Sequence, residues 1–96
     1  MASYRLYRKA ENDLDTLYEY GILAFGVEQA DRYYDALLER LERIADSPDQ
    51  YPFVDYIRPG YRRSICGVHS IFYHEEADGV AIVRILGRQN LSKAFD

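Results

Sequence analysis

The histidines and the paired glutamates are the residues whose types could hold a metal ion. His69 and His74 lie five residues apart on one predicted strand. Side chains alternate between the two faces of a strand, so an odd separation places the two histidines on opposite faces. Two ligands on opposite faces cannot share one metal. Glu75 and Glu76 are adjacent and point apart for the same reason. The sequence therefore predicts no metal site.

The nucleophilic residues lack the surroundings that would activate them. Cys66 is the single cysteine and has no base at a recognisable spacing, so we interpret it as a small core or edge residue. Ser64, Ser70 and Ser92 have no triad context. The chain contains no Gly-rich phosphate loop, Gly-x-Ser-x-Gly turn or His-Glu-x-x-His helix. We therefore predict no catalytic residue and no cofactor.

Arginine is the remaining residue type that could bind another molecule, since its planar guanidinium group recognises carboxylates and phosphates. Arg62 and Arg63 are neighbours on a predicted strand, so at most one lies on an open face. Arg84 interrupts an otherwise apolar strand and requires a partner there. Arg88 follows Gly87, where that strand ends. Each arginine could pair within the fold or contact another molecule, and the sequence leaves both interpretations open.

Two helices are predicted in the first half of the chain, after a short strand over residues 4–8. Apolar residues recur at helical spacing in two stripes: Ala10, Leu14, Leu17, Tyr18, Gly21 and Phe25, then Ala30, Tyr33, Tyr34, Leu37, Leu38, Leu41, Ile44 and Ala45. Gly26 separates the helices, and Ser47-Pro48 ends the second. The short link predicts an antiparallel helical hairpin, with both stripes in the core.

Three strands are predicted in the second half, over residues 61–66, 69–75 and 80–86. Gly67-Val68 and Ala77-Asp78-Gly79 are tight-turn sequences that join them as hairpins. In the middle strand, Ile71 and Tyr73 should share one face and Phe72 the other. The last strand is apolar on both faces apart from its arginine, which favours a central position. The fold class is α+β, in the order β-αα-βββ, with the hairpin packed on a mostly antiparallel sheet.

The amino-acid composition and net charge argue against some classes of function. The 96 residues, 48% hydrophobic and 29% charged, predict one globular domain over 1–96. The net charge of −4 argues against general nucleic-acid binding. Residues 10–55 hold twelve acidic and three basic residues, whereas residues 56–96 hold four acidic and six basic ones. We expect a cytoplasmic protein, because the chain has a single cysteine, no signal peptide and no apolar run of membrane length.

Several segments taken together resemble a known family. They are Tyr4-Arg5-Leu6, Ala10 to Leu14, Phe25-Gly26-Val27-Glu28-Gln29-Ala30, Ser47-Pro48, Arg58-Pro59-Gly60-Tyr61-Arg62-Arg63, Phe72-Tyr73 and Val83-Arg84-Ile85-Leu86. In order and spacing they resemble the ParE branch of the RelE/ParE superfamily of type II toxin–antitoxin toxins. The resemblance implies the β-αα-βββ fold and a toxin that binds and poisons DNA gyrase. It also implies a ParD-like antitoxin with a ribbon-helix-helix N-terminus. The toxin would then meet operator DNA only indirectly, through this antitoxin.

The RelE branch, whose members cut messenger RNA on the ribosome, is the alternative. Aligned with RelE-type nucleases, the chain has Ser70 and Gln89 where they have arginines, and Phe95 near their tyrosine. A phenyl ring has no proton to give in acid–base catalysis. These replacements favour the ParE branch over the endoribonuclease. A degenerate member that only binds its antitoxin stays open.

The site residues follow from the resemblance and the polar pattern. We expect Arg88, Gln89, Asn90 and Leu91, at the exit of the last strand, to contact the target. We expect the strand arginines Arg62, Arg63 and Arg84 to meet acidic residues of the antitoxin.

Overall fold

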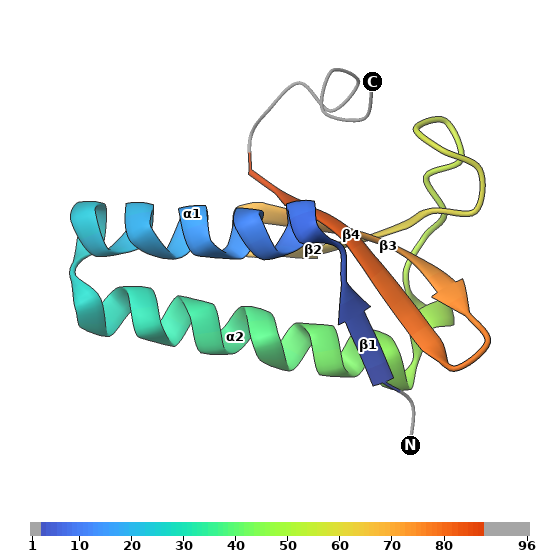
Figure 1. Cartoon of the computed structure of the whole chain (residues 1–96), viewed down its shortest axis with the longest axis horizontal. Coiled ribbons are helices and arrows are strands. Elements are labelled where there is room, and N and C mark those ends of the chain that lie inside the picture. Colours follow the sequence, from blue (N-terminus) through green and yellow to red (C-terminus); the bar gives the residue numbers. More distant parts are fainter. Residues whose placement is uncertain (1–2, 88–96) are drawn as a thin grey trace.

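The computed structural model describes residues 3–87 and confirms the predicted α+β order (Figure 1). The elements are β1 (Ser3–Leu6), α1 (Arg8–Phe25), α2 (Val27–Asp46), a 3-10 turn (Pro48–Gln50), β2 (Arg62–Cys66), β3 (His69–Glu76) and β4 (Gly79–Leu86). The first helix begins two residues earlier than its apolar stripe suggests. The Tyr7 carbonyl already accepts the Glu11 N–H, while the Tyr7 N–H still bonds to Ile82 of the sheet.

The four strands form one sheet in the order β1-β4-β3-β2. β1 runs parallel to β4, and the other neighbours are antiparallel. β4 therefore lies inside the sheet, as its apolar sequence predicted, and β1 and β2 form the edges.

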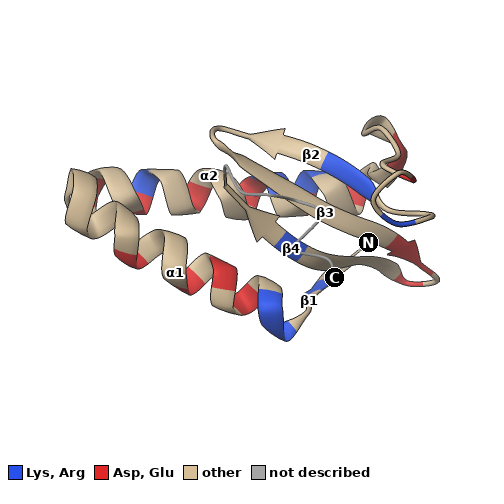
Figure 2. Ribbon diagram, turned by 90° about the horizontal axis from the view of Figure 1, so that it is seen from above, with Lys and Arg blue, Asp and Glu red and all other residues tan. Residues whose placement is uncertain are grey.

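Both helices lie on one face of the sheet as an antiparallel hairpin (Figure 1). Gly26 makes the link: its φ is 90°, and its N–H closes α1 by bonding to the Ile22 carbonyl. The end of the hairpin that carries Gly26 extends past the strands in both views (Figures 1 and 2). Side chains at that end consequently have no sheet beneath them.

The core has two parts, one on each face of the sheet. The larger part joins the helices to the sheet and contains Leu37, Leu41, Ile71 and Tyr73. The smaller part lies on the opposite face, where Phe72 packs with Val54 and Leu86, both buried. The predicted division of β3 between two faces is therefore confirmed.

A β-bulge in β4 is a feature that the sequence pattern did not reveal. Phe72 pairs with Arg84 and Tyr73 pairs with Ile82, so Val83 is an extra residue in the ladder. The insertion returns Ile82 and Ile85, three residues apart, to the same core. Strict alternation would have placed them on opposite faces.

Candidate functional site

An apolar cavity of about 660 Å³ lies between the overhanging end of the helical hairpin and the β2–β3 turn. Its walls are mostly apolar or aromatic: Leu17, Tyr20, Phe25, Ala30, Tyr33 and Val68. Arg32 and His69 add polar groups. Such a lining suits a row of apolar side chains better than a polar metabolite.

Tyr33 of α2 fastens this cavity to the sheet. Its hydroxyl lies 3.1 Å from the Cys66 carbonyl and 2.7 Å from His69 Nδ1, and it accepts the Val68 N–H at 3.1 Å. Burial raises the pKa of Tyr33 and lowers the pKa of His69, because the charged form of each is poorly solvated there. Tyr33 thus ties the β2–β3 turn to α2.

Large apolar side chains at this end of the hairpin and on the β2–β3 turn face solvent, and three of them, Tyr20, Phe25 and Val68, line the cavity. Leu23 is 89% exposed and Phe25 is 63% exposed. Tyr20, Val27 and Val68 are more than half exposed. The prediction that the whole first stripe is core is therefore wrong at Phe25. Helical periodicity identifies an apolar face, but only the placement of the sheet decides how much of that face is covered.

Arg62 lies on the helix-facing side of β2, opposite Tyr73. Its guanidinium stacks 3.7 Å from the centre of the Phe53 ring and donates to the Tyr51 carbonyl at 2.6 Å. A weaker ion pair joins it to Glu75 at 3.7 Å. These contacts hold Arg62 within the fold.

Arg63 lies on the opposite, open face, in register with Phe72. Among residues 3–87 its side chain has no hydrogen bond or ion pair. The structure thus places the two adjacent arginines, both half-buried, on opposite faces of the sheet.

Arg84 has the partner that its position in an apolar strand required. Its Nε and Nη2 donate to the two Asp13 carboxylate oxygens at 2.8 and 2.9 Å. Asp13 Oδ2 also accepts the Ile85 N–H at 2.9 Å, beyond the end of β1. The Asp13 hydrogen bond raises the pKa of Arg84. One α1 carboxylate thus caps the β4 edge and neutralises a partly buried arginine.

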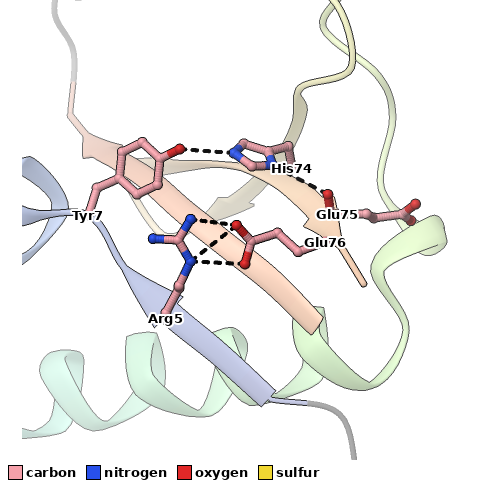
Figure 3. Close-up of polar contacts among 5 residues, drawn as sticks. All are labelled: Arg5, Tyr7, His74, Glu75 and Glu76. Atoms are coloured by element: carbon pink, nitrogen blue, oxygen red, sulfur yellow. Dashed lines mark hydrogen bonds and ion pairs between the residues drawn. The ribbon is translucent and has the colours of Figure 1, made fainter. Parts of the chain in front are cut away.

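The histidines lie on opposite faces of β3, as predicted. His69 contacts Tyr33, whereas His74 Nε2 lies 3.1 Å from the Tyr7 hydroxyl (Figure 3). The Tyr61 ring stacks on His74. In the part of the chain that the structure describes, no group of three histidine, cysteine or acidic residues could hold a metal ion.

A second polar contact lies beside His74. Arg5 of β1 binds Glu76 of β3 through both carboxylate oxygens (Figure 3). This hydrogen bonding raises the pKa of Arg5 and lowers the pKa of Glu76. The pair ties the N-terminal strand to the sheet turn, so we interpret it as structural.

The predicted target segment, Arg88 to Leu91, lies outside the described residues. The described chain ends at Gly87, where an added Cβ would lie 3.6 Å from His69 Nε2. Charge is distributed as the sequence suggested: acidic residues lie along both helices, and arginines lie on β2 and β4 (Figure 2).

No helix within residues 3–87 is long and apolar enough to span a bilayer.

Comparison with known proteins gives one consistent family. Residues 4–91 match the family described as "ParE toxin of type II toxin-antitoxin system, parDE". A protein named Toxin ParE1 from Caulobacter vibrioides is 37% identical over 94 residues, covering 98% of this chain and 97% of that protein. Toxin ParE1 of Mycobacterium tuberculosis is 33% identical over 84 residues, 86% of each chain.

A solved structure has the same fold. It is titled "Chromosomal ParDE TA system from P. aeruginosa" and superimposes with a TM-score of 0.80 at 23% identity, covering 93% of this chain and 98% of that one. The family match over nearly the whole chain, supported by the two relatives and this fold, shows that the chain belongs to the ParE toxin family of type II toxin–antitoxin systems.

Proposed function

We propose that this ParE-family toxin arrests growth by binding and poisoning DNA gyrase, and that a ParD-like antitoxin neutralises it. Two relatives bear the name Toxin ParE1, and the similar solved structure is of a ParDE system. The antitoxin would carry a ribbon-helix-helix N-terminus and bind operator DNA itself, so the toxin would meet DNA only through it. Both partners act in the cytoplasm, where we place this toxin.

The apolar cavity is the observation that carries the antitoxin proposal. An exposed apolar surface around a 660 Å³ cavity is unusual for a protein that functions alone. An amphipathic helix with aliphatic residues at i, i+3 or i+4 would fill it. The antitoxin's C-terminal segment is the occupant that we propose.

Arg63 is the strand arginine that we retain as an antitoxin contact. Its side chain is presented on the open face, where an acidic residue of a wrapping segment could reach it. Arg62 and Arg84 were also expected to make such contacts, but both bind partners within the fold. We therefore propose that Arg63 contributes more than Arg62 or Arg84 to antitoxin affinity.

We propose that gyrase inhibition rests on binding rather than on catalysis. The target contact would be Arg88, Gln89, Asn90 and Leu91, which follow directly from the rigid interior strand β4. On the open face, Ser70 offers a hydroxyl where a RelE-type nuclease would need an arginine. A hydroxyl cannot supply the cationic charge that stabilises a phosphorane-like transition state.

Inducible expression in a bacterial host tests the proposal. The chain alone should stop growth, with filamentation and induction of the DNA-damage response. Co-expression of the neighbouring reading frame should restore growth. A variant with Arg88→Ala, Gln89→Ala and Asn90→Ala together should stay folded and lose the arrest.

Three other results would contradict parts of this proposal. A prompt halt of translation with cleaved messages would favour the endoribonuclease. Normal growth with a folded protein would favour a member that only binds its antitoxin. Full arrest by the folded triple variant would eliminate the proposed target segment.

A further inference from the structure

Residues 53–61, which we call the 53–61 loop, form a rigid projection between the 3-10 turn and β2 (Figure 1). The Val54 N–H donates to the Tyr61 carbonyl at 2.7 Å and closes the base of the loop. The Ile57 N–H donates to the Val54 carbonyl at 2.8 Å, and the Gly60 N–H donates to Asp55 Oδ1 at 2.8 Å. These bonds fix the loop without help from a partner.

The loop is anchored to the open face of the sheet. Val54 is 3% exposed and belongs with Phe72 and Leu86 to the smaller core, against which Ile57 and Tyr61 pack. Leu86 is the last residue of β4, two positions before the proposed target segment. The loop and the end of β4 are therefore held by the same small core.

Tyr56 is the more exposed of the two large exposed apolar side chains of this loop, with 77% of its surface exposed against 52% for Phe53. A tyrosine on a rigid loop supplies a large contact area and loses little conformational entropy on binding, so tyrosines are frequent energetic centres of interfaces. Its neighbours on either side, Asp55 and Ile57, are held by the hydrogen bonds above. No structural role in residues 3–87 explains an aromatic ring at this position.

The surroundings of Tyr56 indicate the charge of a partner. Residues 55–63 contain three arginines and one acidic residue, Asp55. Arg62 is held by Glu75 and the Tyr51 carbonyl, so the local excess of positive charge comes from Arg58 and Arg63, in a chain whose net charge is −4. Arg58 is exposed on the loop, and Arg63 lies on the open face just after it. A protein surface with an apolar slot and an acidic rim would complement this part of the molecule.

The 53–61 loop is also remote from the proposed antitoxin cavity. The cavity lies at the overhanging end of the hairpin, and the loop lies at the opposite end of the molecule (Figure 1). A segment that fills the cavity and continues to Arg63 would reach the base of the loop, where Phe53 pairs with Arg62, and would leave Tyr56 exposed.

We propose that the 53–61 loop, through Tyr56, is a second contact for the toxin's protein target, separate from the antitoxin cavity. This inference rests on the proposed function. Arg63 would bind the antitoxin in the neutralised complex and the target once the antitoxin is lost, so the two partners would exclude each other there.

The test compares matched tyrosine variants at the two ends of the molecule. Tyr56→Ala should raise the expression level needed for half-maximal growth arrest at least tenfold. Its affinity for the purified product of the neighbouring reading frame, measured by calorimetry, should stay within twofold of wild type. Tyr56→Phe keeps the ring and should restore most of the arrest. Tyr20→Ala, at the cavity, should reduce antitoxin affinity at least tenfold.

The outcomes separate this inference from the proposed function. If the wild-type chain does not arrest growth, the proposed function fails and this inference fails with it. If the wild-type chain arrests growth and folded Tyr56→Ala arrests it equally, the inference alone is overturned. An equal loss of antitoxin affinity in Tyr56→Ala would also overturn it, because the loop would then be an antitoxin contact. Should thermal melting show that Tyr56→Ala is unfolded, Tyr56→Gln is judged by the same criteria.

Discussion

At the scale of single residues, Asp13 performs two tasks. It neutralises Arg84 and accepts the Ile85 N–H, so its loss would leave a cation and a strand amide without this carboxylate. Both side chains are largely shielded, with 14% and 17% exposure, which limits compensation by water. The contact joins residues 71 positions apart and so ties α1 to the interior strand.

We therefore predict that Asp13→Ala lowers the free energy of unfolding by about 2–3 kcal/mol. Urea denaturation followed by circular dichroism measures this change. Asp13→Asn keeps an acceptor for Ile85 and should cost less. Asp15→Ala is the matched control, since Asp15 is exposed on the same helix and should change stability by less than about 0.5 kcal/mol. Equal losses in Asp13→Ala and Asp15→Ala would contradict this interpretation.

His69 makes stability depend on pH in a defined direction. Burial lowers its pKa below the ordinary value, and the nearby Asp13 charge opposes this only in part. The unfolded chain, with a His69 pKa of about 6.5, therefore takes up this proton before the folded chain does. Stability from this group is complete above that pH and decreases as the pH falls through it.

We predict that the free energy of unfolding, measured by urea denaturation, decreases as the pH falls from 7.5 to 5.5. This decrease should be smaller in His69→Gln. The readout is the slope of the free energy of unfolding against pH. The absolute stability of His69→Gln is not compared, because the variant also changes the Tyr33 contact. His74→Gln is the matched control and should keep the contribution of His69 to that slope. A slope in His69→Gln equal to that of wild type would exclude His69 as its source.

At the scale of elements, β1 depends on the backbone of Gly79. A Cβ built on Gly79 would lie 1.9 Å from the Ser3 carbonyl oxygen, and its φ of 153° is unfavourable for other residues. β1 is only four residues long, so it cannot shift without losing its parallel pairing with β4. The start of β4 thus requires glycine so that the N-terminal strand can approach.

Gly79→Ala should therefore destabilise the protein by at least about 2 kcal/mol more than Gly60→Ala does. Gly60 also has a positive φ, 83°, but an added Cβ would meet nothing within 4 Å, so it isolates the backbone cost. Urea denaturation gives the difference. Hydrogen exchange at the Tyr7 amide, which bonds to Ile82, should accelerate in Gly79→Ala. Indistinguishable effects of the two substitutions would show that β1 tolerates displacement.

At the scale of the whole molecule, the sheet separates two surfaces of different character. The helix side carries the open apolar cavity, fastened to the sheet by Tyr33. The other side carries Arg63, the smaller core and the 53–61 loop. In the function that we propose, the antitoxin would occupy the first surface and the target the second, with Arg63 as the contact that both would share.

The sequence by itself determined the order and type of the two helices and four strands, but not the 3-10 turn, because helical spacing, strand alternation and turn residues are local signals. The α+β class, the helical hairpin, the interior position of β4 and the opposite faces of His69 and His74 all follow from such signals. The need for a partner at Arg84 was also evident, since a charge in an apolar strand must be compensated.

Only the tertiary structure decided which surfaces stay open. The Val83 bulge changes the faces of β4, the overhang of the hairpin exposes Phe25 and creates the cavity, and the packing of residues 51–61 holds Arg62 inside while Arg63 faces outward. Asp13 became the partner of Arg84 by the same route. Each depends on how distant segments pack against one another, and a periodic pattern along one segment carries no information about the position of another.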